Sequence, residues 1–316
     1  MMSWSLNATA RLSCAAARKP DPLRSLLFVP GDDEKKLAKG LASGADALLI
    51  DLEDSVALSR KPQGREITHH FITQNRHLSA RPRLFVRVNA HTSGLTVTDL
   101  DAVMPAGPDG VMLPKAQSGD DVALLSARLA VREVENNLTD GATSIIAIAT
   151  ETAKSLFHMG SYVGISRRLI GLTWGGEDLS ADVGAESNRL ADGTYTDPYR
   201  LARSLCLFAA SAAEAAAIDS VYTNFRDLAG LEAEALAARR DGFSAKMAIH
   251  PAQVSVINAV FTPSTEAVAR AERIIVLFAT NPDQGVIGLD GEMLDRPHVR
   301  RAERILAAAK AAKALA

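Results

Sequence analysis

Residues 47–54 read ALLIDLED, an apolar run that passes directly into three acidic side chains, Asp51, Glu53 and Asp54. A continuous apolar run is typical of a strand buried on both faces of a parallel sheet, because a strand with one wet face alternates. In parallel α/β barrels the carboxyl ends of the strands carry the binding and catalytic groups. The stretch therefore predicts a parallel strand that delivers carboxylates to a functional rim.

Seven further short apolar runs share this character. Together the eight cover residues 25–29, 47–51, 84–88, 110–113, 144–149, 168–173, 218–222 and 245–249. Helix-like segments alternate with them, among them residues 33–42, 120–136, 198–216 and 228–239, with Asp197 as N-cap of the third and Pro198 at its first position. About eight βα repeats favour a TIM (β/α)8 barrel, and a doubly wound open sheet is the alternative.

The two ends of the chain depart from this pattern. Residues 266–279 and 297–315 are predicted helices separated by the turn-rich residues 281–291, so we expect residues 262–316 to form a lid or oligomerisation segment. Residues 21–261 then form the barrel. Residues 1–20 contain Arg11, Arg18 and Lys19 but no acid, and we expect a disordered extension, with a targeting segment as the alternative.

Bulk composition restricts the function classes. The net charge is −2 with basic residues spread along the chain, which disfavours a nucleic-acid partner. The two cysteines, Cys14 and Cys206, lie outside any metal-binding motif and suggest a reducing compartment, the cytoplasm or alternatively the mitochondrial matrix. No apolar run is long enough to span a membrane, so no membrane partner is expected.

Polar side chains follow almost every predicted strand. They are Asp32, Asp33, Glu53, Asp54, Arg87, Asn89, Lys115, Glu151, Glu177, Asp178 and His250. Asp32, Asp33 and Asp54 could equally be helix N-caps. Glu151 and Asp178 follow neighbouring buried runs, and Asp178 comes after a Gly-Gly pair that permits close approach of a ligand. Two carboxylates without clustered His or Cys suit Mg²⁺, with Mn²⁺ possible, and the ion could act as a Lewis acid on a substrate oxygen.

Seven short motifs at these strand ends occur in the order found in a known family. They are RSLLFVPG (24–31), DLEDSV (51–56), VRVN (86–89), LPK (113–115), ETA (151–153), GEDL (176–179) and IHP (249–251). The chain thus resembles the HpcH/HpaI aldolase and citrate lyase β-subunit-like family, and most of all its citramalyl-CoA and malyl-CoA lyases. The similarity runs from about residue 24 to residue 295.

The resemblance implies roles for individual residues. Glu151 and Asp178 would ligate magnesium, Arg87 would bind the substrate, and backbone N–H groups around Gly175, Gly176, Glu177 and Asp178 would hold the keto-acid carboxylate. CoA would be contacted by Phe28, Lys35, Lys39, Ile249 and His250. Lys35 and Lys39 are four residues apart on a predicted helix and share a face, although a solvated surface explains that spacing equally well.

The tail also resembles the family. Residues 290–297, DGEMLDRP, match a segment in which Asp295 would be a catalytic residue, often delivered by a neighbouring subunit of a homotrimer or hexamer. Asp295 could alternatively cap the last helix, because Pro297 follows closely. Asp295 is the first candidate for the catalytic base and Glu53 the second.

These observations predict a Mg²⁺-dependent carbon–carbon lyase that cleaves or forms a 3-hydroxyacyl-CoA such as citramalyl-CoA or malyl-CoA. The products would be a 2-keto acid and acetyl-CoA. The alternatives are a citrate lyase β subunit acting on an acyl-carrier protein, a malyl-CoA thioesterase, an aldolase acting on free keto acids, and a non-enzymatic RNA-binding or regulatory relative. Fold alone does not decide among them.

Overall fold

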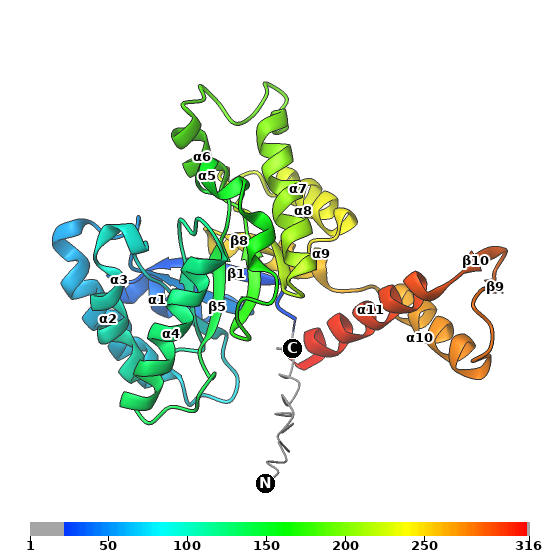
Figure 1. The fold of residues 1–316 in the computed structure, drawn as a ribbon, viewed down its shortest axis with the longest axis horizontal. Helices are drawn as coiled ribbons and strands as arrows, with labels where there is room; N and C mark the ends of the chain where they lie inside the picture. Colours follow the sequence, from blue (N-terminus) through cyan, green and yellow to red (C-terminus); the bar gives the residue numbers. More distant parts are fainter. Residues whose placement is uncertain (1–21, 315–316) are drawn as a thin grey trace, which may run out of the picture.

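Eight parallel strands close into a barrel in sequence order, with β8 pairing back to β1 (Figure 1). The computed structural model describes residues 22–314. The strands are β1 (Ser25–Pro30), β2 (Ala47–Asp51), β3 (Arg83–Arg87), β4 (Gly110–Leu113), β5 (Ser144–Ile148), β6 (Leu169–Thr173), β7 (Ala216–Asp219) and β8 (Ala245–Ala248). Closure confirms the TIM barrel and excludes the open sheet.

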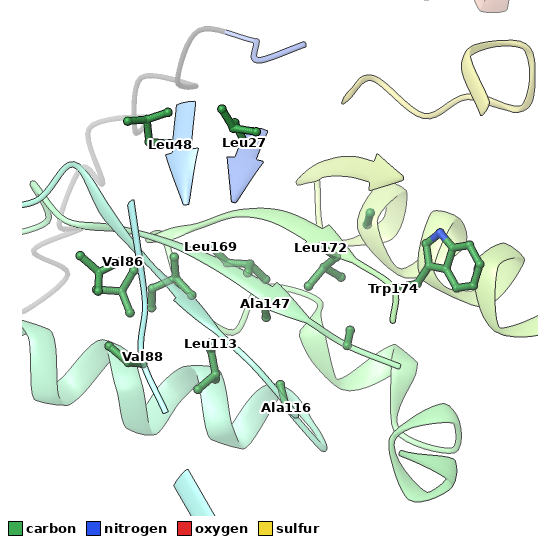
Figure 2. Close-up of a cluster of buried hydrophobic side chains, with 14 of the residues drawn as sticks. Leu27, Leu48, Val86, Val88, Leu113, Ala116, Ala147, Leu169, Leu172 and Trp174 are labelled. Atoms are coloured by element: carbon green, nitrogen blue, oxygen red, sulfur yellow. The ribbon is translucent and has the colours of Figure 1, made fainter. Parts of the chain in front are cut away.

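Each strand is buried on both faces. Leu49, Phe85 and Met112 belong to a cluster that fills the barrel interior. The alternate residues, such as Leu48 and Val86, belong to a second and larger cluster between the strands and the helices (Figure 2). The two layers explain why the strands are continuous apolar runs, since successive side chains point to opposite faces and both faces are dry.

Helices alternate with the strands around the outside. They are α1 (Glu34–Leu41), α2 (Lys61–Asn75), α3 (Thr96–Val103), α4 (Gly119–Glu135), α5 (Ala153–Leu156), α6 (Gly176–Val183), α7 (Asp197–Ala212), α8 (Leu228–Asp241) and α9 (Pro251–Phe261). Asp33 caps α1, accepting from the Lys36 N–H at 3.0 Å, as one interpretation of the sequence allowed. Asp32 instead pairs with Arg60.

The prediction was wrong around β7. The third predicted helix ran to residue 216, but α7 ends at Ala212, and β7 occupies residues 216–219 rather than 218–222. Alanines dominate residues 209–217, and their helix propensity hides the boundary. Glu214, in the left-handed region with φ +55°, turns the chain into β7. Asp197 is the first residue of α7, and the N-cap is Thr196.

The C-terminal residues form an arm that projects away from the barrel (Figure 1). It consists of α10 (Thr265–Thr280), a hairpin of β9 (Ile287–Leu289) and β10 (Glu292–Leu294), and α11 (Arg296–Ala314). The hairpin was not predicted within the turn-rich segment. Its turn is Asp290-Gly291, both at positive φ, which is the sequence that such tight turns prefer.

The arm has a small hydrophobic core of its own. That core includes Ile274 and Phe278 of α10, Ile287 and Leu294 of the hairpin, and Ala302 of α11. Among residues 22–314, no helix has the length and apolar character needed to cross a bilayer. The expected N-terminal extension, residues 1–20, lies outside the described residues.

Candidate active site

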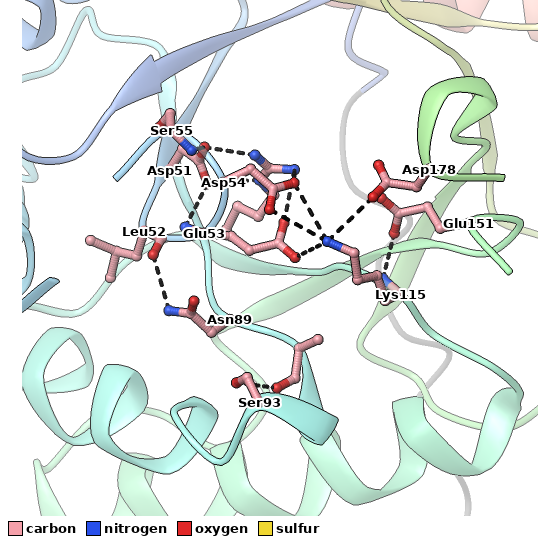
Figure 3. A network of polar contacts seen from close by, with 12 residues as sticks. Asp51, Leu52, Glu53, Asp54, Ser55, Asn89, Ser93, Lys115, Glu151 and Asp178 are labelled. Carbon is pink, nitrogen blue, oxygen red and sulfur yellow. Dashed lines mark hydrogen bonds and ion pairs between the residues drawn. The ribbon is translucent and has the colours of Figure 1, made fainter. Parts of the chain in front are cut away.

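The carboxyl ends of five consecutive strands place charged side chains together at one rim of the barrel. Figure 3 shows most of this cluster, in which Asp51 ends β2, Glu53 and Asp54 follow it, Lys115 follows β4, Glu151 follows β5 and Asp178 lies in α6. Arg87, the last residue of β3, completes it. We call these seven residues the rim cluster. The sequence prediction that Glu53, Arg87, Glu151 and Asp178 converge is consistent with this arrangement.

Arg87 is held rigidly by Asp51. Its Nε and Nη2 atoms donate to the two carboxylate oxygens of Asp51 at 2.7 and 2.6 Å, and its guanidinium lies 4.9 Å from the centre of the Phe28 ring. Asp51 is buried, which opposes its charged form, but Arg87 outweighs that effect and the pKa of Asp51 lies below its usual value. Such a two-pronged contact fixes the guanidinium in one orientation.

Glu53 bridges the two cations of the rim cluster. Its Oε2 lies 2.9 Å from Arg87 Nη1, and its Oε1 accepts from Lys115 Nζ at 2.6 Å. Burial nevertheless raises the pKa of Glu53 above its usual value, against the pull of Arg87 and Lys115. A buried carboxyl with a raised pKa is chemically suited to accept and return a proton.

Lys115 contacts the cluster through its backbone and its side chain. Its backbone is left-handed, with φ +52°, and its N–H donates to Oε2 of Glu151. Its Nζ lies 3.5 Å from both carboxylate oxygens of Asp54 and 3.4 Å from Asp178 Oδ1, in addition to Glu53. Burial opposes the ammonium, yet these carboxylates raise the pKa of Lys115. Lys115 is thus a fixed cation at the centre of the cluster.

Glu151 is only 3% exposed and lies beneath the loop after β6. A Cβ added to Gly175 would lie 2.6 Å from Cγ of Glu151, so glycine is required there by close approach. The φ of Gly175 is −120°, which any residue adopts. Burial, and then the nearby charge of Asp178, raise the pKa of Glu151 well above its usual value. A cation beside Glu151 and Asp178 would therefore favour the ionised form of Glu151.

The rim cluster fits a hard divalent cation. Five carboxylates meet there, and among the described residues the cations that contact them are Arg87 and Lys115. No group of three or more His, Cys, Asp or Glu side chains suited to a metal occurs within residues 22–314. Mg²⁺, however, commonly takes only one or two protein carboxylates and completes its shell with water and substrate oxygens. Glu151 and Asp178 match that donor set.

The loop after β6 presents backbone donors next to this pair. Gly175 is the N-cap of α6, so the N–H groups of Gly176, Glu177 and Asp178 occupy the first turn, where no intrahelical carbonyl reaches them. The N–H of Gly175 donates instead to Thr150 Oγ1 at 3.2 Å. The N–H group of Gly175 thus has a partner within the protein, whereas those of residues 176–178 point out of the first turn of α6.

The residues expected to contact CoA lie at the adjacent strands β1 and β8. Phe28 lies in β1 against Arg87, and Lys35 and Lys39 are exposed on α1. Ile249 and His250 follow β8 and are exposed. His250 accepts from the Ala252 N–H as the N-cap of α9, and its ring stacks on Phe225 at 5.0 Å. Phe28 therefore contacts the rim cluster, Ile249 and His250 follow the neighbouring strand β8, and Lys35 and Lys39 lie on the helix that follows β1.

Asp295 is not brought to the rim cluster within this chain. It directly follows β10, which lies on the arm away from the barrel (Figure 1). Its Oδ1 lies 2.7 Å from Nδ1 of His298 in the first turn of α11. This position is consistent with the alternative role at the start of the last helix. A catalytic role requires delivery to another copy.

Sequence reasoning assigned no role to Asp51 or to Lys115. Asp51 and Arg87 pair as the last residues of neighbouring strands, which the strand prediction could have suggested. The left-handed backbone of Lys115 carries no sequence signal, because lysine rarely adopts it.

The comparisons with known proteins agree with this geometry. Residues 24–251 match the family model described as HpcH/HpaI aldolase/citrate lyase. The chain is 36% identical to a citrate lyase subunit beta-like protein of Mycobacterium tuberculosis, covering 89% of this chain and 93% of the relative. It is 32% identical to the mitochondrial citramalyl-CoA lyase of Mus musculus, covering 96% and 90%.

A solved structure is similar over nearly the same length. It is the protein CitE of Mycobacterium tuberculosis in complex with magnesium, acetoacetate and coenzyme A. The TM-score is 0.72 and the sequence identity 34%, with 92% of this chain and 98% of that chain covered. Fold and sequence therefore point to the same relatives.

Proposed function

The chain belongs to the HpcH/HpaI aldolase/citrate lyase family, and from that premise we propose that it is a Mg²⁺-dependent carbon–carbon lyase acting on a 3-hydroxyacyl-CoA. The substrate class includes citramalyl-CoA and malyl-CoA, and the products are a 2-keto acid and acetyl-CoA. The observation that carries the proposal is the rim cluster, in which Lys115 links the carboxylates Glu151 and Asp178 to Glu53, and Arg87 contacts Glu53 from the other side.

Glu151 and Asp178 are the residues that would hold the cation. When bound there, Mg²⁺ supplies Lewis-acid stabilisation of negative charge on the substrate oxygens. The charge excess of the rim cluster supports this placement, as does the magnesium in the similar CitE structure. The backbone N–H groups of Gly176, Glu177 and Asp178 are aligned to hold the keto-acid carboxylate at the positive end of α6.

Arg87 stabilises the charge that develops during bond cleavage. In the cleavage direction the C3 hydroxyl loses its proton, the carbon–carbon bond breaks, and its electron pair forms the thioester enolate. Protonation of that enolate gives acetyl-CoA. Because Asp51 fixes the Arg87 guanidinium, Arg87 offers its charge without having to reorganise, which is the most effective form of electrostatic stabilisation.

A carboxylic acid group protonates the thioester enolate. Asp295, delivered by the arm of a neighbouring copy in a trimer or hexamer, is the first candidate. Glu53 is the second, because it lies in the rim cluster with a raised pKa. In the condensing direction the same group removes a proton from the thioester methyl.

The CoA moiety belongs along β1 and β8. Lys35 and Lys39 offer ammonium groups to its phosphates, and Phe28, Ile249 and His250 offer apolar and aromatic surface. The exposure of both lysines and their position beside β1 support this assignment.

The test is to incubate the purified protein with Mg²⁺ and malyl-, methylmalyl- or citramalyl-CoA and to measure keto-acid release. We expect release that EDTA abolishes and that the variant Asp178→Ala lacks. Asp197→Ala, at a 94% exposed carboxylate on α7, is the matched control and should keep full activity. Free CoA without keto acid would indicate a thioesterase. Near-normal lyase activity of Asp178→Ala would contradict the metal assignment.

A further inference from the structure

Lys115 holds a position that the proposed reaction does not use. Its Nζ lies between carboxylates from two sides of the barrel, 2.6 Å from Glu53 Oε1 on the β2 side and 3.4 Å from Asp178 Oδ1 on the β6 side (Figure 3). Asp178 is also one of the two carboxylates suited to the cation. The ammonium of Lys115 and a metal ion at Glu151 and Asp178 are therefore directed to the same carboxylate.

The backbone of Lys115 holds the residue next to both proposed metal ligands. Its N–H donates to Glu151 Oε2, so the residue contacts both proposed metal ligands. The backbone is left-handed at a residue that is not glycine, a conformation that persists only where the surroundings impose it. The side chain is half-buried, at 30% exposure, and so cannot move far into solvent without breaking its contacts.

We propose that Lys115 is a built-in counter-ion that competes with the divalent cation for Asp178 and thereby sets the cation affinity of the site. This inference rests on the proposed function in one respect, namely the placement of the cation at Glu151 and Asp178. When the cation binds, Asp178 exchanges its ammonium partner for the metal. Lys115 then remains paired with Glu53 and Asp54.

Two physical arguments support the exchange. An ammonium and a divalent cation that share one carboxylate repel each other, and the repulsion is strong in a partly desolvated site. Lys115 also keeps two other carboxylates within 3.5 Å, so losing Asp178 leaves it paired. Lys115 can therefore give up its contact with Asp178 when a metal binds. Breaking that ion pair nevertheless lowers the metal affinity compared with a site that lacks the ammonium.

Three variants separate charge from backbone effects. Lys115→Met removes the ammonium and keeps most of the stem. Lys115→Gly removes the whole side chain, keeps the N–H that donates to Glu151, and suits the left-handed backbone. Lys115→Arg keeps the positive charge.

The experiment is a calorimetric titration of each folded variant with Mg²⁺ and with Mn²⁺, without any thioester. We expect Lys115→Met and Lys115→Gly to bind both cations roughly tenfold more tightly than the unchanged protein, and Lys115→Arg to stay within about threefold of it. Circular dichroism of each variant checks that the barrel is intact.

Unchanged affinity in both uncharged variants would overturn the proposal, because the ammonium would then not compete for Asp178. Weaker binding in both would also overturn it, since Lys115 would then support the site rather than oppose the cation. Either result leaves the lyase proposal standing if the unchanged protein still cleaves a hydroxyacyl-CoA. Tighter binding supports the inference even if no tested thioester is cleaved.

Discussion

At the scale of the residue, Arg87 combines rigidity with charge. Both of its outer contacts with Asp51 are shorter than 2.8 Å, and its remaining Nη1 faces Glu53. A lysine at this position would supply one compact charge and could not make the two-pronged contact with Asp51. Arg87 therefore contributes a fixed orientation of its guanidinium as well as a positive charge.

We therefore predict that Arg87→Lys lowers the rate of keto-acid release about 10²–10³-fold, the usual loss when one preorganised donor is removed. The measurement is steady-state kinetics with the best thioester. Arg132→Lys, which alters an ion pair on the outer surface of α4, is the control and should keep the normal rate. A loss of less than about tenfold would show that Arg87 does not act on the developing charge.

From the raised pKa of Glu151 we predict that cation binding depends on pH. This pKa is raised well above 4.5, and only the ionised carboxylate binds a metal. A proton thus competes with the cation up to that raised pKa, so affinity should increase as the pH rises. Mn²⁺ titrations between about pH 5 and about pH 8 would measure the slope. In Glu151→Gln the binding should be weak and its slope much smaller, whereas an equally steep slope would locate the competing proton elsewhere.

At the scale of the element, a buried charge network supports the short loop that leads from β6 into α6, the helix that carries Asp178. Asp219 at the end of β7 accepts from Trp174 Nε1 at 2.8 Å and from Lys246 Nζ of β8 at 2.8 Å. Arg203 of α7 donates to the same carboxylate, and Glu234 of α8 also pairs with Lys246. Trp174 directly precedes the Gly175-Gly176 pair, so the network anchors that loop from the helix side of the barrel.

We predict that Lys246→Met destabilises the protein by about 3 kcal/mol, the lower part of the range for breaking a buried ion pair, because Arg203 still compensates Asp219. Denaturant unfolding is the measurement. Asp101→Ala, which removes a 60% exposed carboxylate that pairs with Arg132, is the control and should cost about 1 kcal/mol or less. A negligible change in the free energy of unfolding of Lys246→Met would mean that hydrophobic packing alone stabilises the region around Trp174 and Asp219.

At the scale of the whole molecule, the arm raises the question of where Asp295 acts. The arm has its own hydrophobic core and projects from the barrel, so its Asp295 and the rim cluster of the same chain are separated (Figure 1). A symmetric assembly could place the arm of one copy over the rim of the next. This arrangement is the one under which Asp295 becomes a catalytic residue.

Complementation tests this arrangement. Asp178→Ala and Asp295→Ala should each be inactive, but their co-expression should restore up to about a quarter of the activity if chains assemble at random, because some sites then combine an intact rim with an intact arm. The measurement is keto-acid release by purified mixed oligomers. Mixed oligomers that form but remain inactive would show that Asp295 does not act in a neighbouring site, and Glu53 would become the first candidate for the base.

Much of the fold was predictable because strands that are buried on both faces appear in the sequence as continuous apolar runs. Seven of the eight strands were placed to within one residue at each end. The seventh was misplaced where an alanine-rich helix runs into an alanine-rich strand, since propensity and pattern do not distinguish the two there. In that segment the pairing of β7 with β6 and β8 decides the boundary.

The sequence by itself determined the barrel, the rim on which the polar residues meet, and the identity of most of them, because strand order and strand ends fix which loops share a face. Only the tertiary structure decided which side chain contacts which. It pairs Arg87 with Asp51, places Lys115 between Glu53 and Asp178, and separates Asp295 from all of them. Those choices depend on backbone conformation, burial and close approach among residues far apart in the chain, which local sequence does not encode.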